Sequence, residues 1–180
     1  AAQAANAGLE VILLDIVAEG SDRAAVARGA IQRMRKTNPA PLMHPRNAGR
    51  IRPGNLDDHL DWLADCDLVI EAVLENLEIK KDLYQKVDAH RRSDCIVTSN
   101  TSTIPLDHLV ADMPEDFREH FAVTHFFNPP RYMRLLELVA GSVTRAGVIT
   151  ALRDFGDRLL GKSVVDCKDT PGFIANRIGI

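Results

Sequence analysis

A histidine at the end of one apolar segment and a carboxylate inside another could together perform acid–base chemistry. His125 lies within the apolar segment 121–127, and Glu137 lies at the centre of the apolar run 135–139. A buried carboxylate without a partner is costly, and a contact with His125 would remove that cost. The carboxylate would then orient the imidazole and stabilise its cation, as the acid of a catalytic triad does. The alternative is a structural histidine, which is the commoner role of a lone histidine at a strand end.

Further polar side chains follow the predicted strands at their carboxyl ends, where open α/β sheets bind their ligands. These residues are Asp15, Glu75, Asn100 to Ser102, and Asn128. For three of these sites a structural alternative is open. Asp15 could simply close a strand, residues 100–103 could form a turn and a helix cap, and Glu75 could be the first acid of a solvated helix.

The elements that position these residues alternate between strands and helices. Short apolar runs predict strands at 9–15, 66–73 and 95–99, and helical spacing of apolar residues predicts helices at 21–36 and 76–92. Residues 37–55 hold four prolines and two glycines, so this segment is predicted to be irregular, with one helical turn at 46–50. The alternation implies right-handed crossovers, and therefore an α/β fold with a parallel sheet and helices on both faces.

The pattern changes after residue 100. Strands at 121–127 and 135–139, joined by a short loop that contains proline, predict an antiparallel annex to the sheet. A helix at 144–160 and a strand at 163–166 follow. The segment Thr170-Pro171-Gly172 opens a final helix that is predicted to be still running at Ile180.

The first residues suggest that the chain begins inside a larger unit. Residues 1–8 are typical of a helix and a turn, and the strand that follows ends in Asp15. In a dinucleotide-binding βαβ unit, the acid that holds the adenosine ribose lies about 20 residues beyond the glycine-rich loop. Counting back from Asp15 puts that loop before Ala1. We therefore expect the first strand and the glycine-rich loop to be missing here.

The composition excludes several classes of protein. The chain has 180 residues, of which 46% are hydrophobic and 26% charged, so it belongs to the ordinary globular class. A net charge of −3 gives no general argument for binding nucleic acid or a membrane surface. No apolar run approaches the ~20 residues of a membrane span, and no secretory signal is visible. Three widely spaced cysteines fit free thiols in a reducing compartment, so we expect a cytoplasmic protein without a metal site.

Several motifs, taken together and in chain order, resemble the 3-hydroxyacyl-CoA dehydrogenase family. They are Val69–Asn76, Ser99–Thr103, His125–Pro130, Leu136–Val139 and Lys168–Arg177. The resemblance covers nearly the whole chain and implies a Rossmann-like, doubly wound domain that binds NAD and carries an antiparallel annex. It implies that residues 1–168 form this domain, truncated at its N-terminus. Residues 169–180 would begin a C-terminal helical dehydrogenase domain.

The resemblance also implies a reaction, the NAD-dependent oxidation of a (3S)-3-hydroxyacyl-CoA to a 3-oxoacyl-CoA in fatty-acid β-oxidation. On this basis His125 is the general base and Glu137 is its partner. Ser102 and Asn176 would bind the substrate oxygen and the surroundings of the imidazole. The cofactor-binding residues would be Asp15 at the adenosine ribose and Glu75, Lys80, Ser102 and Asn128 along the rest of NAD.

The same resemblance implies an acyl-CoA substrate and a homodimer formed through the missing helical domain. The proline-rich segment 44–54 and residues 130–133 look most like the bacterial subfamily in which the dehydrogenase is fused to an enoyl-CoA hydratase unit. Two alternatives stay open. One is a dehydrogenase of the same fold that acts on a hydroxy acid without CoA, against which the basic helix 23–36 argues. The other is an inactive fragment of a multifunctional β-oxidation enzyme, because without the glycine-rich loop this chain should bind NAD poorly.

Overall fold

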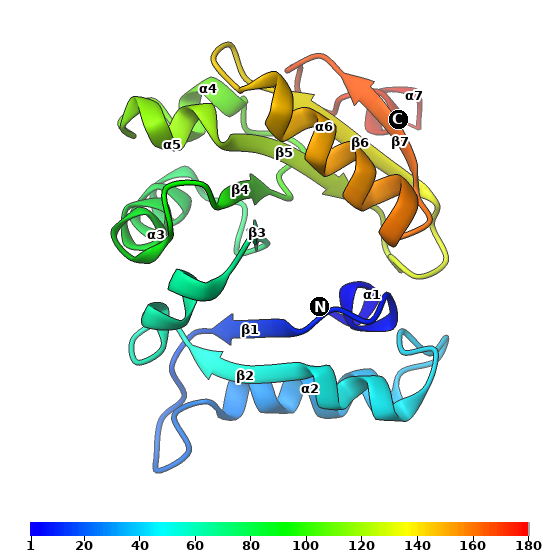
Figure 1. The fold of residues 1–180 in the computed structure, drawn as a ribbon. Coiled ribbons are helices and arrows are strands. Elements are labelled where there is room, and N and C mark those ends of the chain that lie inside the picture. The colour runs from blue at the N-terminus through cyan, green and yellow to red at the C-terminus, as the bar shows by residue number, and fades with distance from the viewer. Residues whose placement is uncertain (180) are drawn as a thin grey trace. The chain divides into compact units, whose positions relative to one another are not determined.

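The computed structural model describes residues 1–179, which form two compact units (Figure 1). The first unit consists of Ala1–Trp62 and Asn128–Arg134, and the second of Leu63–Phe127 and 135–179. Each unit has its own sheet.

The first unit contains a parallel sheet of two strands, β1 (Val11–Asp15) and β2 (Ile51–Asn55). Helix α1 (Ala2–Asn6), helix α2 (Ala25–Lys36) and a 3₁₀ helix (Pro45–Arg50) complete it. Its core is a cluster of apolar side chains from these elements: Ala5, Ile31, Leu42, Ala48 and Ile51. The amphipathic helix predicted at 21–36 is confirmed, although it begins at Ala25.

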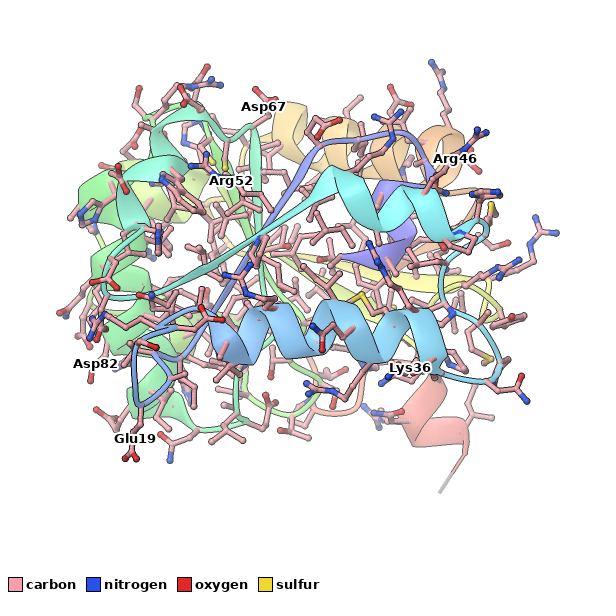
Figure 2. All side chains as sticks on the ribbon, turned by 90° about the horizontal axis from the view of Figure 1, so that it is seen from below. Glu19, Lys36, Arg46, Arg52, Asp67 and Asp82 are labelled. Carbon is pink, nitrogen blue, oxygen red and sulfur yellow. The ribbon has the colours of Figure 1, made fainter. Side chains whose placement is uncertain are left out.

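Basic side chains gather in the last turn of α2, where cations interact favourably with the helix dipole. Figure 2 shows Lys36 at this end of α2 and Arg46 on the 3₁₀ helix. Residues Asn128–Arg134 belong to the same unit because the guanidinium of Arg131 donates to the carbonyl oxygens of Ala40 (2.7 Å) and Leu42 (3.0 Å).

Strand β2 contradicts the prediction that residues 37–55 are irregular. It pairs in register with β1, from Val11 opposite Ile51 to Asp15 opposite Asn55. Pro53 and Gly54 lie inside β2, and both residue types are depleted in strands. Gly54 is needed because a Cβ atom there would lie 2.7 Å from Leu14 Cδ2 and 2.8 Å from Trp62 Cζ3. Pro53 and Gly54 make this strand hard to recognise in the sequence, and close packing explains the glycine.

The second unit contains a sheet of five strands in the order β3-β4-β5-β6-β7 (Figure 1). The strands are β3 (Leu68–Glu71), β4 (Ile96–Ser99), β5 (Phe121–Phe126), β6 (Leu135–Ala140) and β7 (Ser163–Cys167). β3, β4 and β5 are parallel, β6 is antiparallel to β5, and β7 is parallel to β6. This arrangement confirms the predicted α/β fold with a mostly parallel sheet and an antiparallel annex.

Helices complete the second unit. The helices are α3 (Leu77–His90), α4 (Leu106–Leu109), α5 (Glu115–Glu119), α6 (Ala146–Asp154) and α7 (Ala175–Ile178). A 3₁₀ helix (Leu60–Asp65) precedes β3, and a π-helical turn (Phe155–Leu159) follows α6. Ala122 and Leu138 of the sheet pack against Val148 and Leu152 of α6. The rings of Tyr84, Phe117 and Phe121 lie against one another on α3, α5 and β5.

Several predicted elements need correction. The sequence predicts one helix at 144–160, but α6 ends at Asp154 and a π-helical turn replaces its last part. The final helix begins at Ala175 and not at Pro171, because Gly172 and Phe173 adopt positive φ angles of 80° and 45°. It ends at Ile178, so the predicted continuation is wrong at Gly179, and Ile180 lies outside the described residues. The domain boundary at residue 168 stays a prediction. Within residues 1–179, no helix is long and apolar enough to cross a membrane.

Candidate active site

His125 and Glu137 meet on neighbouring antiparallel strands. The register of β5 and β6 places the two residues directly opposite each other. His125 Nδ1 lies 2.8 Å from Glu137 Oε2, and the relative exposures of the two residues are 8% and 0%. The contact expected from the sequence is therefore present. Because a carboxylate can only accept a hydrogen bond, Nδ1 is its donor, and in the neutral imidazole Nε2 keeps a lone pair for a ligand.

The second oxygen of Glu137 binds the chain that leads into α7. Oε1 accepts hydrogen bonds from the backbone N–H groups of Ile174 (3.0 Å) and Ala175 (2.8 Å). Hydrogen bonds to a carboxylate are stronger than those between neutral groups. These contacts explain how a fully buried carboxylate is tolerated inside an apolar strand. The sequence gives no signal for them, because a backbone amide is common to almost every residue.

Two aromatic rings flank the imidazole of His125. The centroid of the Phe127 ring lies 4.6 Å away at 61°, and that of the Phe173 ring lies 5.7 Å away at 59°. Phe173 is buried, and its φ of 45° is uncommon for a bulky residue. The turn is held in place because Gly172 N–H donates to the Ser102 carbonyl oxygen (2.7 Å). The same turn therefore contacts the imidazole, the carboxylate of Glu137 and the loop at Ser102.

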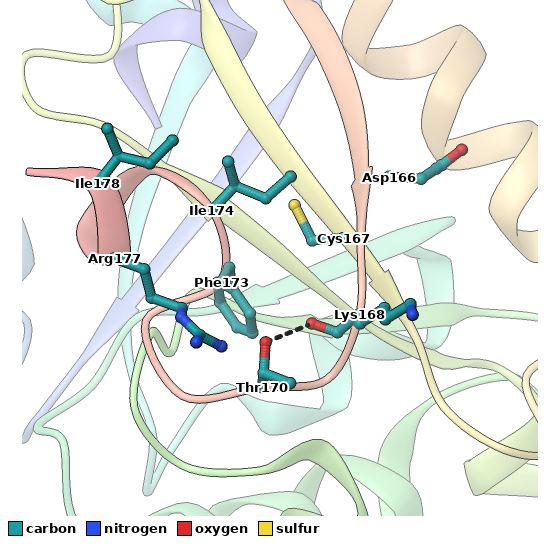
Figure 3. Close-up of a pocket in the computed structure, with 8 residues that line it drawn as sticks. All are labelled: Asp166, Cys167, Lys168, Thr170, Phe173, Ile174, Arg177 and Ile178. Carbon is teal, nitrogen blue, oxygen red and sulfur yellow. Dashed lines mark hydrogen bonds between the residues drawn. The ribbon is translucent and has the colours of Figure 1, made fainter.

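Asn176 lies on α7, beside a small cavity of about 390 Å³. Thr103 and Gly172 line the same cavity, so the structure brings Asn176 close to the loop that contains Ser102. A larger cavity of about 510 Å³ is lined by Cys167, Phe173 and Ile174 among others (Figure 3). Burial, followed by the charge of Glu137, raises the pKa of the Cys167 thiol to about 11. The thiol therefore stays protonated at neutral pH and is a poor nucleophile.

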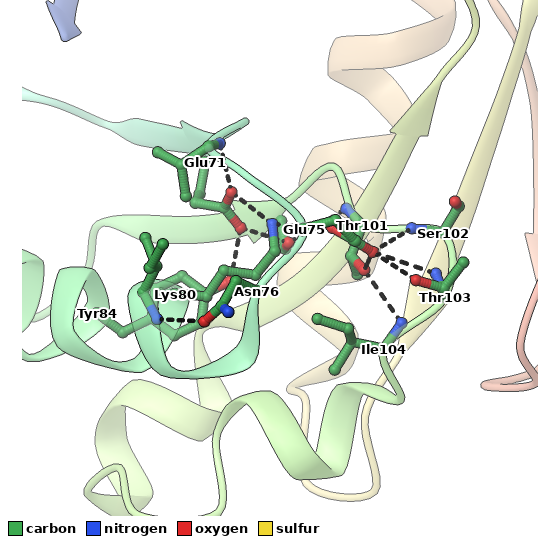
Figure 4. A network of polar contacts seen from close by, with 12 residues as sticks. Glu71, Glu75, Asn76, Lys80, Tyr84, Thr101, Ser102, Thr103 and Ile104 are labelled. Atoms are coloured by element: carbon green, nitrogen blue, oxygen red, sulfur yellow. Dashed lines mark hydrogen bonds and ion pairs between the residues drawn. The ribbon is translucent and has the colours of Figure 1, made fainter. Parts of the chain in front are cut away.

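Glu75 lies between β3 and α3 and contacts the loop after β4 (Figure 4). Its Oε1 accepts from the hydroxyls of Thr101 and Thr103 and, at 3.4 Å, from the N–H groups of Ser102 and Thr103. Its Oε2 lies 3.2 Å from Lys80 Nζ. Burial alone would raise the pKa of Glu75, but the hydrogen bonds from the two threonines and the charge of Lys80 outweigh it and hold this pKa at about 2. Glu75 is therefore charged and organises the loop.

We expect Glu75→Gln to lower the free energy of unfolding at neutral pH and to have less effect in acid. The folded pKa of Glu75, about 2, is below the ordinary value of 4.5. A depressed pKa contributes stability that is present above the ordinary value and is lost as the pH falls through the folded value. Urea denaturation at about pH 7 and about pH 3 measures this change. Glu78→Gln is the control, because Glu78 is an exposed residue in the first turn of α3. The effect of this substitution on the free energy of unfolding should not differ in the same way between the two pH values.

Lys80 differs from the other predicted cofactor-binding residues of this unit. Its side chain is 1% exposed, and its Nζ lies 2.7 Å from Glu71 Oε1 as well as 3.2 Å from Glu75. A direct contact with a ligand would require the ammonium to leave these carboxylates. Glu75 itself is 39% exposed, and the Ser102 hydroxyl points away from Glu75 (Figure 4). These two groups fit a ligand rich in hydroxyl and amide groups, as NAD is.

The remaining predicted residues, Asp15 and Asn128, belong to the first unit. Asp15 ends β1, and its Oδ1 accepts a hydrogen bond from the N–H of Ile16 (2.8 Å). Asn128 begins the segment Asn128–Arg134. The structure therefore brings together, within the second unit, six of the eight predicted site residues: His125, Glu137, Ser102, Asn176, Glu75 and Lys80.

Comparisons with known proteins agree with the motifs. The model of the family described as "3-hydroxyacyl-CoA dehydrogenase, NAD binding domain" matches residues 1–170. A putative fatty acid oxidation complex trifunctional enzyme of Rickettsia felis is 46% identical over 180 residues, which are 99% of this chain and 25% of that protein. Four curated relatives match 99% or more of the chain, and the chain spans between 25% and 52% of their length.

Solved structures with the same fold include two dehydrogenases with different names. The 3-hydroxybutyryl-CoA dehydrogenase of Escherichia coli K12 has a TM-score of 0.79 and 34% identity, covering 98% of this chain and 37% of that one. An FHMPC 5-dehydrogenase, described as an NAD+ dependent dismutase, has a TM-score of 0.76 and 32% identity, covering 99% and 56%. The predictions of family and fold class are confirmed, and the match to an NAD-binding domain agrees with NAD as the predicted cofactor. This chain belongs to the NAD-binding domain family of the 3-hydroxyacyl-CoA dehydrogenases.

Proposed function

We propose that the protein containing this chain oxidises a (3S)-3-hydroxyacyl-CoA to a 3-oxoacyl-CoA with NAD, and that His125 is the general base. The observation that carries this proposal is the buried pair of His125 and Glu137, with Nδ1 and Oε2 2.8 Å apart. It lies in a domain whose family binds NAD and acts on 3-hydroxyacyl-CoA. A base held by a buried carboxylate is suited to removing a proton from a hydroxyl group.

The chemistry divides between the protein and the cofactor. When bound, NAD supplies the acceptor for the hydride that leaves C3 of the substrate. His125 Nε2 takes the proton of the 3-hydroxyl, and the negative charge of Glu137 stabilises the imidazolium that forms. The rings of Phe127 and Phe173 pack against the imidazole. Ser102 and Asn176 would hold the substrate oxygen so that C3 is correctly placed for the transfer.

The activity is tested by following NADH formation with (S)-3-hydroxybutyryl-CoA and with free 3-hydroxybutyrate. Rapid turnover of the thioester alone supports the proposal. A specific observation favours a second candidate: the FHMPC 5-dehydrogenase is named for a pyridine carboxylic acid and not for a CoA ester. Equal turnover of free hydroxy acids would favour this alternative. No turnover of any substrate would favour the inactive fragment.

The wider setting is also part of the proposal. The name of the R. felis relative supports a place in fatty-acid β-oxidation within a multifunctional enzyme. We further propose a cytoplasmic homodimer formed through a helical domain that begins at residue 169. Light scattering of the protein that contains this chain would measure its oligomeric state, and a monomer would contradict the dimer.

We expect this protein to prefer NAD to NADP, mainly because of Asp15. A carboxylate at the end of β1 accepts hydrogen bonds from ribose hydroxyls but repels a 2′-phosphate. Arg23 is the nearest following arginine in the sequence, and it is engaged by Asp58, with Nε and Oδ2 2.6 Å apart. Asp15→Ala should therefore lower kcat/KM for NAD by roughly 10- to 100-fold and relax the discrimination.

The measurement is the ratio of kcat/KM for NAD to that for NADP in wild type and variant. Glu10→Gln is the control, because Glu10 lies just before the other end of β1 and pairs with Arg50. A ratio near unity in the wild type, or one that Asp15→Ala leaves unchanged, would show that Asp15 only closes the strand.

A further inference from the structure

A buried carboxylate lies opposite Ser99, the residue that leads into the loop of Ser102. Glu71 is the last residue of β3, and its side chain is 1% exposed. Its Oε1 accepts from Lys80 Nζ (2.7 Å) and Val73 N–H (2.7 Å). Its Oε2 accepts from Tyr84 Oη (2.7 Å) and Ser99 Oγ (2.6 Å). Each oxygen of Glu71 therefore accepts two hydrogen bonds, and Figure 4 shows the carboxylate facing α3.

Lys80 connects this buried carboxylate to the exposed one. It lies in α3, and its ammonium contacts both Glu71 and Glu75. Asn76 fixes the start of this helix, because its side chain caps α3 by accepting from Ile79 N–H (3.1 Å). The helix thus places the ammonium of Lys80 between two carboxylates, Glu71 at the end of β3 and Glu75 in the loop after it.

Glu75 links Lys80 to the loop of residues 101–103. Its carboxylate binds two threonine hydroxyls and two backbone N–H groups of residues 101–103. The carbonyl oxygen of Ser102 accepts from Gly172 N–H, which belongs to the turn that packs on His125. The backbone of Ser102 is therefore held on both sides, while its hydroxyl points away from Glu75 (Figure 4).

Stability alone is a weak reason for such an arrangement. Taking an ammonium and a carboxylate out of water is costly, and well-packed neutral residues often serve stability as well or better. Here the buried pair of Glu71 and Lys80 contacts Glu75, a partly exposed carboxylate. Glu75 lies at the carboxyl ends of the strands, where ligands of α/β sheets bind. Burial raises the pKa of Tyr84, so its hydroxyl remains a hydrogen-bond donor to Glu71.

We infer that Glu71 and Lys80 are positioning residues, which act through Glu75 to hold the 101–103 loop and the Ser102 hydroxyl in place. Lys80 then supports the site through its contact with Glu75. The effect on catalysis rests on the proposed function, whereas the effect on the loop does not. The experiment therefore measures both in the protein that contains this chain.

The decisive variant is the double substitution Glu71→Gln/Lys80→Met. It removes both buried charges together, so the fold should tolerate it better than Lys80→Met alone, which leaves the buried Glu71 unpaired. The amide that replaces the Glu71 carboxylate can still bind Tyr84 and Ser99, but Glu75 loses its ammonium partner. Lys81→Met is the matched control, because Lys81 is the next residue of α3 and pairs with Asp112 at the surface. Glu75→Gln is the second test variant, because it leaves the Glu71–Lys80 pair intact.

Hydrogen exchange of the peptide that covers 100–104 measures the loop without any ligand. In the double variant we expect this peptide to exchange about tenfold faster or more, while peptides of β4 and β5 keep their wild-type protection. We expect kcat/KM for 3-hydroxybutyryl-CoA and NAD to fall by roughly 10- to 100-fold at a temperature where the variant is fully folded. Glu75→Gln should reproduce both effects, and Lys81→Met neither.

The outcomes separate the possible roles. The inference is overturned if the double variant keeps wild-type exchange in 100–104. It is also overturned if any condition that restores the melting temperature of the variant restores its activity too, because the network is then only structural. If the double variant does not fold, Lys80→Gln decides on the exchange of 100–104, because it removes the ammonium partner of Glu75 and keeps a polar side chain beside Glu71. A wild type that binds no NADH and turns over no 3-hydroxyacyl-CoA would overturn the proposed function, and the exchange data would still decide whether the loop is positioned in this way.

Discussion

Replacing His125 by glutamine in the protein that contains this chain should lower kcat by roughly 10²- to 10⁴-fold. Glutamine has a similar reach and keeps a polar side chain, but it cannot take a proton from a hydroxyl group. The structure directs Nδ1 to Glu137, so the lost function is that of Nε2. Substrate binding should change much less, because the interaction that is removed develops mainly in the transition state. Initial rates at saturating NAD and 3-hydroxybutyryl-CoA measure the effect.

His120 offers a matched control. It is as buried as His125, at 8% exposure, and it lies just before the same strand. Its Nδ1 lies 2.8 Å from the carbonyl oxygen of Asp116, a contact within one helical turn. His120→Gln should therefore affect stability more than turnover. Near-normal kcat in His125→Gln, or an equal loss in both variants, would contradict the assignment of His125 as the base.

The sequence predicts the features that depend on regular patterns. Alternating apolar runs and amphipathic segments identify β3, α3, β4, β5 and β6 with small errors at their ends. The pairing of His125 with Glu137 also follows from a local argument, since a carboxylate within an apolar strand needs a partner. The antiparallel register that makes them neighbours is a consequence of two short strands and the loop between them.

The features that the sequence does not reveal depend on tertiary contacts. β2 is hidden because Pro53 and Gly54 are poor strand residues, and only the packing of Leu14 and Trp62 explains why glycine is needed. The two amides on Glu137 belong to Ile174 and Ala175, whose side chains give no hint of this contact.

Lys80 illustrates the same limit for a charged side chain. A lysine in the first turns of an amphipathic helix looks solvated in the sequence, and the family resemblance suggests a cofactor contact. The structure buries its ammonium because Glu71 lies on the neighbouring strand at hydrogen-bond distance. No local pattern distinguishes these situations, since the burial of a charge is decided by a partner that lies elsewhere in the chain.

The substitution Glu137→Gln should be almost as damaging to turnover as the loss of His125, on the order of 10²- to 10⁴-fold, without unfolding the domain. The amide of glutamine has one oxygen and one NH₂ group. Its oxygen can replace Oε1 and accept from Ile174 and Ala175, which leaves the NH₂ group facing His125 Nδ1. Nδ1 must then be an acceptor, so the proton of the neutral imidazole moves to Nε2. A protonated Nε2 cannot take the proton of the substrate hydroxyl.

This tautomer argument distinguishes Glu137→Gln from a merely structural defect. The melting temperature should fall only modestly, because the two backbone N–H groups keep an acceptor, whereas Glu137→Leu leaves both of them unsatisfied at a cost of about 1–3 kcal/mol for each. The affinity for NADH should be close to that of the wild type in Glu137→Gln, because the glutamine stays beneath His125. Nitrogen-15 NMR of the imidazole would show the proton on Nδ1 in the wild type and on Nε2 in the variant. A fully folded Glu137→Gln protein with near-normal kcat would mean that Glu137 serves the turn at Phe173 and not the base.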